Sequence, residues 1–390
     1  MLHIHQVNLQ RAVGGGEVYT RGFTRALADA SARVTLYVHP DNRFWDGVQD
    51  DRVRLRTVPD PQALAALLPR RDALVMTQSP VPPSFIAQAA AEHVLTGFSH
   101  MPMLGRSAEG FRPYAEVFTV SRYCIGLLRA AGISQVWDEP VYGTFALERP
   151  PAGRLEATSP YLWDTRKVRD RLLALAEPAL ARLRPRRPYV ARPGLTLGIV
   201  SLIAPIKQFP ALFTLVAPHL ARHPQVNLEV FGHGGYAQVR DLRRALAPLA
   251  GRVRYWGFQP SVQAVYPHLD YLLTGLPEKE ALGLNVIEAQ ACGTPVLAPA
   301  APPFTETVLD GRSGFLYRDP REDGGVAFGA LLDSLVAGRT RPDPRVEAAE
   351  HLQAFSYPAL VGRAQRILAY LAARHPRAAR ATQATDGASA

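Results

Sequence analysis

Two glutamates, Glu280 and Glu288, stand eight positions apart in the stretch GLPEKEALGLNVIEAQACGTPVLAP. Such a pair could act as acid and base, clamp a ligand, or lie on the exposed face of a helix. If a helix begins near Gly283 or Leu284, both carboxylates can reach its N-terminus, because each helical residue rises only about 1.5 Å. The free N–H groups and positive dipole of that end suit a phosphate, and a carboxylate can accept hydrogen bonds from the two hydroxyls of a sugar or ribose.

The simpler interpretation is that acids at the start of a helix only complement its dipole. The residues between the glutamates favour a ligand clamp, because a glycine at position 283 lets a ligand approach the backbone closely. We therefore expect a phosphate on the backbone and hydroxyls on the two carboxylates.

These side chains need elements that position them. Short β-rich runs alternate with amphipathic helical stretches along most of the chain, which is typical of parallel sheets with crossover helices. A first series predicts strands at 2–7, 33–38, 73–77, 94–98 and 117–120, with helices at 18–28 and 84–92. A second series predicts strands at 195–200, 227–231, 253–255, 271–273, 295–298 and 314–317, with helices at 207–222, 237–249, 284–292 and 326–336.

The chain of 390 residues is too long for one ordinary core, so two domains are expected. Both are α/β and doubly wound like a Rossmann fold, with ligands bound where strand ends face the cleft between them. We place the first domain at 1–150, a linker with a charged helix at 151–193 and the second domain at 194–350. A helix at 351–373 follows, and the tail at 374–390, rich in Ala, Thr, Ser and Gly, is predicted to be disordered.

The composition excludes some classes of function but does not select one. The chain is 47% apolar and has no run of 18 apolar residues, so a membrane-spanning helix is not expected, and its N-terminus lacks the pattern of a signal peptide. Cys124 and Cys292 have no metal-ligand spacing and are expected to be core thiols in a reducing cytoplasm. The net charge of +10 is spread along helices without a nucleic-acid-binding signature, and it suits an anionic membrane or a phosphorylated substrate.

The motif from Glu280 to Glu288, followed by Ala-Gln-Ala-Cys-Gly-Thr-Pro-Val, resembles the E-x7-E motif of retaining GT-B glycosyltransferases of the large group-1 family. Weaker similarities occur in the order of that family, over roughly residues 1–372. They are the glycine loop at 14–17, Val120-Ser121 followed by a helix, the segment 140–145, the Gly-x-Gly turn at 231–234, Trp256-Gly257-Phe258, the loop 310–316 and Phe355-Ser356-Tyr357 before a helix.

The resemblance implies the GT-B fold: two Rossmann-like domains facing a cleft, with a C-terminal helix crossing back to the N-terminal domain. The second domain would bind a nucleotide-activated sugar. Glu280 would hold hydroxyls of the donor sugar and Glu288 the ribose, so neither is expected to take a proton. Backbone amides of Gly283, Leu284 and Asn285 would meet the diphosphate or the sugar.

The segment that ends at Lys207 is similar to the family's Gly-Arg-Leu-x-x-x-Lys, and Lys207 would neutralise the leaving diphosphate. A solvated lysine at a helix start is the alternative. This chain departs from the family at the arginine and glycine, where it has Leu202 and Ser201. Either Lys279 or Arg192 substitutes for the arginine, phosphate binding is weakened, or catalysis has been lost.

On the N-terminal side, the resemblance places Gly15 and Gly16 beside the donor, and Gly232 in the turn of the donor domain. The glycine loop could instead be a simple turn, and it lacks the full dinucleotide pattern G-x-G-x-x-G. His100 ends a strand and would contact the donor sugar, although a single histidine is more often structural. Glu17 is expected only to complement a helix dipole.

The loop after His100 could bind the acceptor through Arg106, Arg112 and Tyr114. The resemblance thus implies a cytoplasmic enzyme that transfers a sugar from a nucleoside diphosphate to a hydroxyl of a glycan or glycolipid, with retention. Such an acceptor would fit polysaccharide or lipopolysaccharide biosynthesis in a bacterium. Peripheral contact with the inner membrane is compatible with the charge.

No cofactor and no metal is expected, since the chain has no Asp-x-Asp, and no nucleic-acid partner is expected. Two alternatives stay open. One is a non-catalytic GT-B subunit or glycan-binding partner, which Leu202 makes conceivable. The other is a nucleotide-sugar epimerase or phosphorylase of the same fold, although neither extra acid–base residues nor a pyridoxal lysine can be identified.

Overall fold

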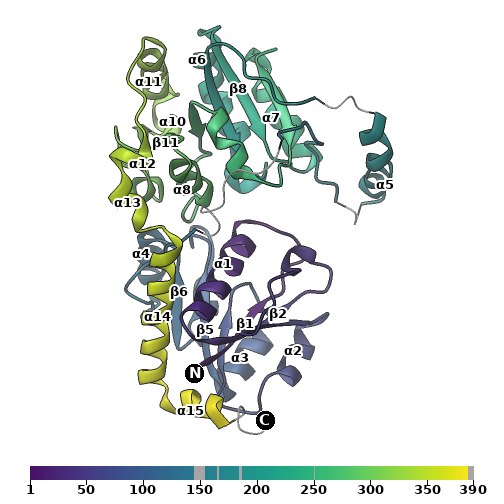
Figure 1. Cartoon of the computed structure of the whole chain (residues 1–390), viewed down its shortest axis with the longest axis vertical. Helices are drawn as coiled ribbons and strands as arrows, with labels where there is room; N and C mark the ends of the chain where they lie inside the picture. The colour runs from purple at the N-terminus through teal and green to yellow at the C-terminus, as the bar shows by residue number, and fades with distance from the viewer. Residues whose placement is uncertain (145–153, 165–166, 184–186, 250, 385–390) are drawn as a thin grey trace. The chain divides into compact units, whose positions relative to one another are not determined.

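The computed structural model describes residues 1–144, 154–164, 167–183, 187–249 and 251–384. The chain forms two compact units (Figure 1). The first unit contains Met1–Ala146 and Gln353–Ala390, and the second contains Leu147–Leu352. Each unit is an α/β domain built on one six-stranded parallel sheet, as the alternating sequence pattern predicts.

The sheet of the first unit has the strand order β3-β2-β1-β4-β5-β6. The order reverses between β1 and β4, and such a reversal is where doubly wound sheets bind ligands, outside the carboxyl ends of the strands. His3 of β1 pairs with Arg33 of β2, and Ile4 pairs with Leu74 of β4. The strands are β1 (His3–Asn8), β2 (Arg33–Val38), β3 (Val53–Thr57), β4 (Leu74–Thr77), β5 (Val94–Ser99) and β6 (Glu116–Thr119).

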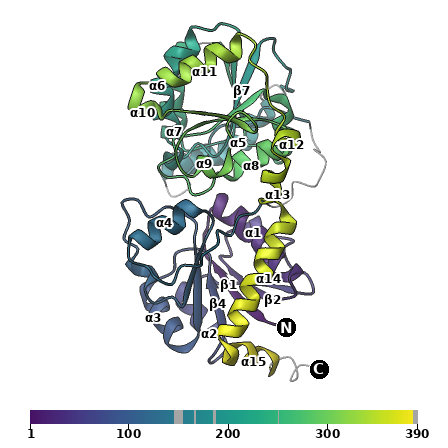
Figure 2. The same ribbon diagram turned by 90° about the vertical axis from the view of Figure 1, so that its left-hand side faces the viewer.

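Helices cover both faces of this sheet, so its central strands are buried along nearly their whole length. On one face α1 (Gly15–Asp29) packs against α14 (Tyr357–Arg374), which runs along the unit in Figure 2. The C-terminal helix thus returns to the N-terminal domain as expected. Elsewhere α2 (Pro61–Leu67) packs against α3 (Pro83–Glu92), and α4 (Arg122–Ala130) follows β6.

The sheet of the second unit has the order β12-β11-β10-β7-β8-β9 and reverses in the same way between β10 and β7. All neighbouring strands are parallel, so the loops after β7, β8 and β10 leave the sheet at one edge. The strands are β7 (Leu195–Val200), β8 (Val226–Phe231), β9 (Val253–Gly257), β10 (Tyr271–Leu273), β11 (Val296–Pro299) and β12 (Gly314–Tyr317).

Two apolar cores fill the faces of this second sheet. One lies under α6, α7 and α11 and includes Phe213, Leu242 and Phe328, which are all buried. The other lies under α8 and includes Val286 and Phe304. The helices are α6 (Phe209–Ala221), α7 (Tyr236–Ala245), α8 (Leu284–Ala291), α9 (Phe304–Thr307), α10 (Pro320–Asp323), α11 (Val326–Val336), α12 (Pro344–Glu347) and α13 (Ala349–Gln353).

The described part of the predicted linker is attached to the second unit. The Thr158 hydroxyl donates to the Trp256 carbonyl at 3.1 Å, and Tyr161 forms a parallel bridge with Gly234. The prediction of a separate linker at 151–193 is therefore wrong, because this segment satisfies its hydrogen bonds on loops at the edge of the second sheet. Within it, 151–153, 165–166 and 184–186 lie outside the described residues, as do 145–150 at the end of the predicted first domain.

The charged helix predicted in this segment is present as α5 (Val168–Leu183). The disordered tail predicted from residue 374 is wrong for α15 (Pro376–Ala384), which packs against α14 and buries Ala378. Alanine and arginine are strong helix formers, and a proline suits the first turn of a helix, so the tail composition supports a helix once a packing surface is present. Residues 385–390 lie outside the described residues.

A fully buried carboxylate holds the edge of the second sheet together. Glu229, in the middle of β8, accepts hydrogen bonds from Arg254 (2.6 Å), Arg192 (3.0 Å) and the Trp256 indole (2.6 Å). Buried charges are tolerated only when they are paired and hydrogen-bonded. These bonds therefore fix β8 to β9 and to the chain entering β7.

We predict that Arg254→Met lowers the free energy of unfolding by about 3 kcal/mol, because it removes the main partner of a buried charge. Urea denaturation followed by tryptophan fluorescence measures the change. Arg240→Met is the matched control, since Arg240 is half exposed and pairs with its neighbour Asp241; it should change stability by less than about 0.5 kcal/mol. Equal effects of both variants would contradict the assignment.

Candidate functional site

The carboxyl edge of the second sheet brings Lys207 and Glu280 into contact. Lys207 ends a short 3-10 turn, Pro205–Lys207, in the loop after β7, and Glu280 lies in the loop between β10 and α8. The Lys207 ammonium forms an ion pair and hydrogen bond with Glu280 Oε2. The two side chains keep 23% and 15% of their surface exposed, so the pair is partly shielded yet reachable from solvent.

The second oxygen of Glu280 shapes the loop before α8. Glu280 Oε1 accepts hydrogen bonds from the backbone amides of Ala281 and Gly283, each at 3.2 Å. Gly283 is the N-cap residue of α8 and has a φ of 82°, a conformation that residues with a Cβ rarely adopt. The Gly283 amide, which the resemblance assigns to a ligand, donates to Glu280 in this structure.

The next two amides of α8, those of Leu284 and Asn285, are not used within the helix, as for every helix N-terminus. No acceptor among the described residues contacts them. The Asn285 side chain instead donates to the Val200 carbonyl at 3.1 Å, which ties the helix start to the end of β7. The first turn of α8 thus presents backbone donors beside the Lys207 ammonium, an arrangement suited to an anion.

Glu288 lies one turn further along α8, where Oε2 accepts a hydrogen bond from the Tyr266 hydroxyl at 3.0 Å. Burial raises the pKa of the Glu288 carboxyl above its usual value, while the Tyr266 bond and the nearby Lys207 charge oppose this shift. Tyr266 is held by Thr294 of the Cys-Gly-Thr-Pro turn, whose hydroxyl donates to the Tyr266 carbonyl at 2.7 Å. Tyr266 is not among the residues predicted from the sequence, because no spacing in the sequence marks it.

Gly232 follows β8 and touches the loop after β7. A Cβ at this position would lie 1.9 Å from the Ser201 carbonyl oxygen, so only glycine lets the two backbones approach so closely. This contact positions the loop that carries Leu202 and Lys207. Direct contact between Gly232 and a donor stays a prediction.

The two cations considered as replacements for the missing arginine have different surroundings. Arg192 precedes β7 and donates to the Gly251 and Arg252 carbonyls as well as to Glu229, at the opposite edge of the sheet. The suggestion that Arg192 replaces the arginine is therefore wrong. Lys279 is exposed in the same loop as Glu280. It stays the candidate.

In the first unit, His100 follows β5 and therefore lies at the carboxyl edge of that unit's own sheet. Its Nε2 lies 2.8 Å from Oε1 of the buried Gln78, and its ring packs against Tyr19 and Phe98. Gly16 lies close to the His100 ring, because a Cβ there would come within 4.0 Å of it. Gln78 directly follows β4, and a polar residue at the end of a parallel strand is the signal that could have identified it.

Glu17 acts as expected for a helix start, since its Oε2 accepts the Gly14 amide at 2.8 Å. Gly15 and Gly16 form the first turn of α1. Burial lowers the pKa of His100 to about 4, so the ring is neutral at physiological pH. A contact of Gly15, Gly16 or His100 with a donor stays a prediction.

The three predicted acceptor residues differ in their exposure to solvent. Tyr114 is buried in the core of the first unit, with its hydroxyl bonded to Thr77 at 3.1 Å and its ring against Gly97, so the prediction that it binds an acceptor is wrong. Large aromatic rings gain more from burial than from lying in a loop. Arg112 is exposed and paired with Glu109, and Arg106 is exposed; for both, acceptor binding stays a prediction.

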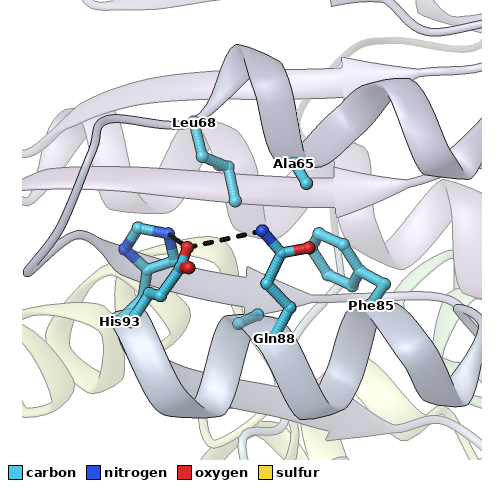
Figure 3. A pocket seen from close by; sticks show the side chains of 7 residues that line it. Ala65, Leu68, Phe85, Gln88 and His93 are labelled. Atoms are coloured by element: carbon cyan, nitrogen blue, oxygen red, sulfur yellow. Dashed lines mark hydrogen bonds and ion pairs between the residues drawn. The ribbon is translucent and has the colours of Figure 1, made fainter.

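A small hollow between α2 and α3 does not belong to this edge (Figure 3). It is lined by Ala65, Leu68, Phe85, Gln88 and His93, among others, and has no room for a water molecule. His93 immediately precedes β5, whereas His100 follows it, so the hollow lies at the amino edge of the sheet. We therefore assign no ligand to it.

Neither cysteine forms a disulfide, as expected. Cys124 is buried in α4 of the first unit, and Cys292 is half-buried at the end of α8 in the second. Burial raises the pKa of the Cys292 thiol to about 11, with the nearby Glu288 charge adding to the shift. A thiol of this kind is a poor nucleophile at neutral pH, so Cys292 is a structural residue.

Comparison with known proteins agrees with this geometry. Residues 194–333 match the family described as glycosyl transferases, group 1. The C-terminal domain is a group-1 glycosyltransferase domain. The match covers the strands β7 to β12 and the whole Lys207–Glu280–Glu288 site.

Curated relatives include two bacterial D-inositol 3-phosphate glycosyltransferases. The protein of Stackebrandtia nassauensis is 34% identical over 163 residues, which are 38% of this chain and 35% of the relative. That of Geodermatophilus obscurus is 33% identical over 218 residues, 52% of this chain and 46% of the relative. The chain thus matches less than half the length of either relative.

Solved structures share the fold across nearly the whole chain. Anabaena Alr3699/HepE in complex with UDP-glucose superposes with a TM-score of 0.64 at 18% identity, covering 95% of this chain and all of the other. Sucrose-phosphate synthase from Thermosynechococcus elongatus gives a TM-score of 0.68 at 17% identity, covering 96% of this chain and all of the other. The fold is GT-B.

We predict that the free energy of unfolding decreases as the pH falls from about 6.5 to 4. The pKa of His100 is lower in the folded protein, so the unfolded chain takes up the proton first, and stability that is complete above pH 6.5 is lost towards pH 4. Over this pH range, a histidine that stays neutral only in the folded protein changes the free energy of unfolding by up to about 1.4 kcal/mol per pH unit. Urea denaturation of wild type and His100→Gln at several pH values measures the slope, which the variant should reduce; an unchanged slope would contradict the buried neutral ring.

Proposed function

We propose that the protein is a glycosyltransferase that moves a sugar from a nucleoside diphosphate donor to a hydroxyl acceptor with retention of configuration. The observation that carries the proposal is the Lys207–Glu280 pair beside the unused amides of Leu284 and Asn285. A cation, a helix N-terminus and a carboxylate together match the phosphates and hydroxyls of such a donor. The group-1 family match over this segment supports the same proposal.

Each group has a separate task in the proposed complex. The amides of Leu284 and Asn285 bind phosphate oxygens, and Lys207 neutralises the diphosphate. Glu280 turns from Lys207 to the hydroxyls of the donor sugar, while its loop keeps the bend that it holds here. Glu288, which is kept in position by Tyr266, accepts hydrogen bonds from the ribose hydroxyls.

The transfer needs no protein nucleophile. The bond between the anomeric carbon and the phosphate oxygen breaks, and the acceptor oxygen attacks the same face of the sugar. The departing phosphate takes the proton of the attacking hydroxyl, so the products are a glycoside and a nucleoside diphosphate. Lys207 and the α8 dipole stabilise the charge that grows on the phosphate as it leaves.

The rival enzyme classes are less well supported. A phosphorylase would bind pyridoxal on a lysine, and the chain has only three, Lys167, Lys207 and Lys279. Of these, Lys207 is occupied by Glu280 in the phosphate site. An epimerase needs further acid–base residues, whereas Glu288 is bonded to Tyr266 and suited to binding.

The acceptor is proposed to be a hydroxyl of a glycan or glycolipid, in bacterial polysaccharide or lipopolysaccharide biosynthesis in the cytoplasm. The names of the curated relatives add inositol 3-phosphate as a further acceptor to test. A non-catalytic GT-B subunit is the second candidate, and Leu202 in place of an arginine is the observation that favours it.

The test begins with a screen of nucleotide sugars for thermal stabilisation of the full chain. A donor present at a hundred times its Kd should stabilise the folded state by about 2.7 kcal/mol, which raises the melting temperature by a few degrees. Hits are then assayed for hydrolysis and for transfer to glycan, glycolipid and inositol 3-phosphate acceptors. Failure of every nucleotide to stabilise the protein would refute donor binding.

Stabilisation without turnover on any acceptor would favour the non-catalytic subunit.

For the residue assignment, we predict that Glu280→Gln lowers kcat/KM about 100-fold, because an amide cannot replace the carboxylate on the donor hydroxyls. Steady-state kinetics with the stabilising donor measures the loss. Glu278→Gln is the matched control: Glu278 lies in the same loop but pairs with Arg321 at the surface, and its loss should change kcat/KM less than about twofold. Activity of Glu280→Gln equal to that of wild type would contradict the assignment.

A further inference from the structure

Helix α5 exposes an apolar stripe. Val168, Leu172 and Leu175 keep 66%, 62% and 74% of their surface exposed. Their spacing of four and three residues places them on one face of the helix, and the exposed Ala179 continues it for a further turn. Over these residues the stripe is about 17 Å long.

The polar face of α5 is turned inward instead. Asp170 is only 4% exposed and accepts two hydrogen bonds from Arg169. Glu177, seven residues later on the same face, accepts a hydrogen bond from the Trp163 indole at 3.3 Å. The Arg169 guanidinium also lies over the Tyr236 ring of α7, 4.9 Å from its centre.

These contacts fix the rotation of α5. A surface helix of a soluble domain normally buries its apolar stripe and exposes its acids. In α5 the acids are bonded to Arg169 and Trp163, and Arg169 in turn contacts α7, while the leucines are exposed. The stripe is therefore positioned to meet another surface.

Positive charge borders the stripe on one side. Lys167 directly precedes the helix and Arg171 lies next to Leu175, and both are exposed. The described acids of α5, Asp170 and Glu177, lie on the opposite face. The two described charges beside the stripe are therefore both basic.

We propose that α5 docks the protein on an anionic lipid surface, with its apolar stripe inserted among the acyl chains and its basic residues on the phosphates. An apolar stripe bordered by Lys and Arg, on a helix that does not span the bilayer, is the pattern of an interfacial helix. A protein partner would also cover leucines, but the exposed Lys167 and Arg171 beside them favour an anionic surface. The proposal does not depend on the transferase activity.

No helix among the described residues is long and apolar enough to cross a membrane, so docking of this kind would be peripheral.

The full chain is sedimented with vesicles of phosphatidylcholine, with and without phosphatidylglycerol. We expect binding to the anionic vesicles only, weakened by added salt. Leu172→Asp combined with Leu175→Asp should reduce the partition coefficient between vesicles and water at least about tenfold, because two leucines that would be buried among the acyl chains are lost.

The matched control is Val346→Asp, which places an acid at an equally exposed apolar position of α12 in the same unit, where Val346 is 76% exposed. It should bind vesicles like wild type. Unchanged melting temperatures and unchanged stabilisation by nucleotide would show that the α5 variant is folded.

Two results would overturn the proposal. One is equal vesicle binding by wild type and the α5 variant. The other is no binding to either vesicle, together with a dimer in analytical ultracentrifugation that the α5 variant dissociates, which would assign the stripe to a second copy of the chain.

Discussion

The partly buried ion pair between Lys207 and Glu280 is the interaction on which the site depends. A charge removed from water must be paired, and each of these two charges lies in a different loop of the sheet edge. Their attraction therefore joins the loop after β7 to the loop before α8. The same loops are joined again by Asn285, which donates to Val200, so the start of α8 has one defined position relative to β7.

The pair also explains how the site can be both stable and reactive. Without a ligand, Glu280 neutralises Lys207 and caps the turn at Gly283. A phosphate can take the place of the carboxylate on Lys207, and the freed Oε2 can then accept a sugar hydroxyl. Among 44 basic residues only three are lysines, and a compact ammonium on a flexible stem suits such an exchange better than a planar guanidinium.

Much of this arrangement follows from the sequence. Central strands such as β7 are continuous apolar runs between helices, so their positions are predicted to within about one residue, and the Glu280–Glu288 spacing places the start of α8 correctly. The edge strand β3 is not predicted, although arginines alternate with apolar residues in it, because it is short and only Val53 of its five residues is buried. Tyr266 and Gln78 are missed and Tyr114 is misassigned, since their contacts join segments far apart in the chain.

In the proposed complex, Lys207 binds the diphosphate of the donor. Isothermal titration of the stabilising nucleoside diphosphate, and of the nucleoside without phosphates, tests it in wild type and in Lys207→Met, with Lys167→Met as the control, since Lys167 is an exposed lysine outside the site. We expect Lys207→Met to weaken diphosphate binding about 10- to 100-fold, as the loss of a charged hydrogen bond does, and to leave nucleoside binding unchanged. Equal affinity of wild type and Lys207→Met for the diphosphate would contradict it.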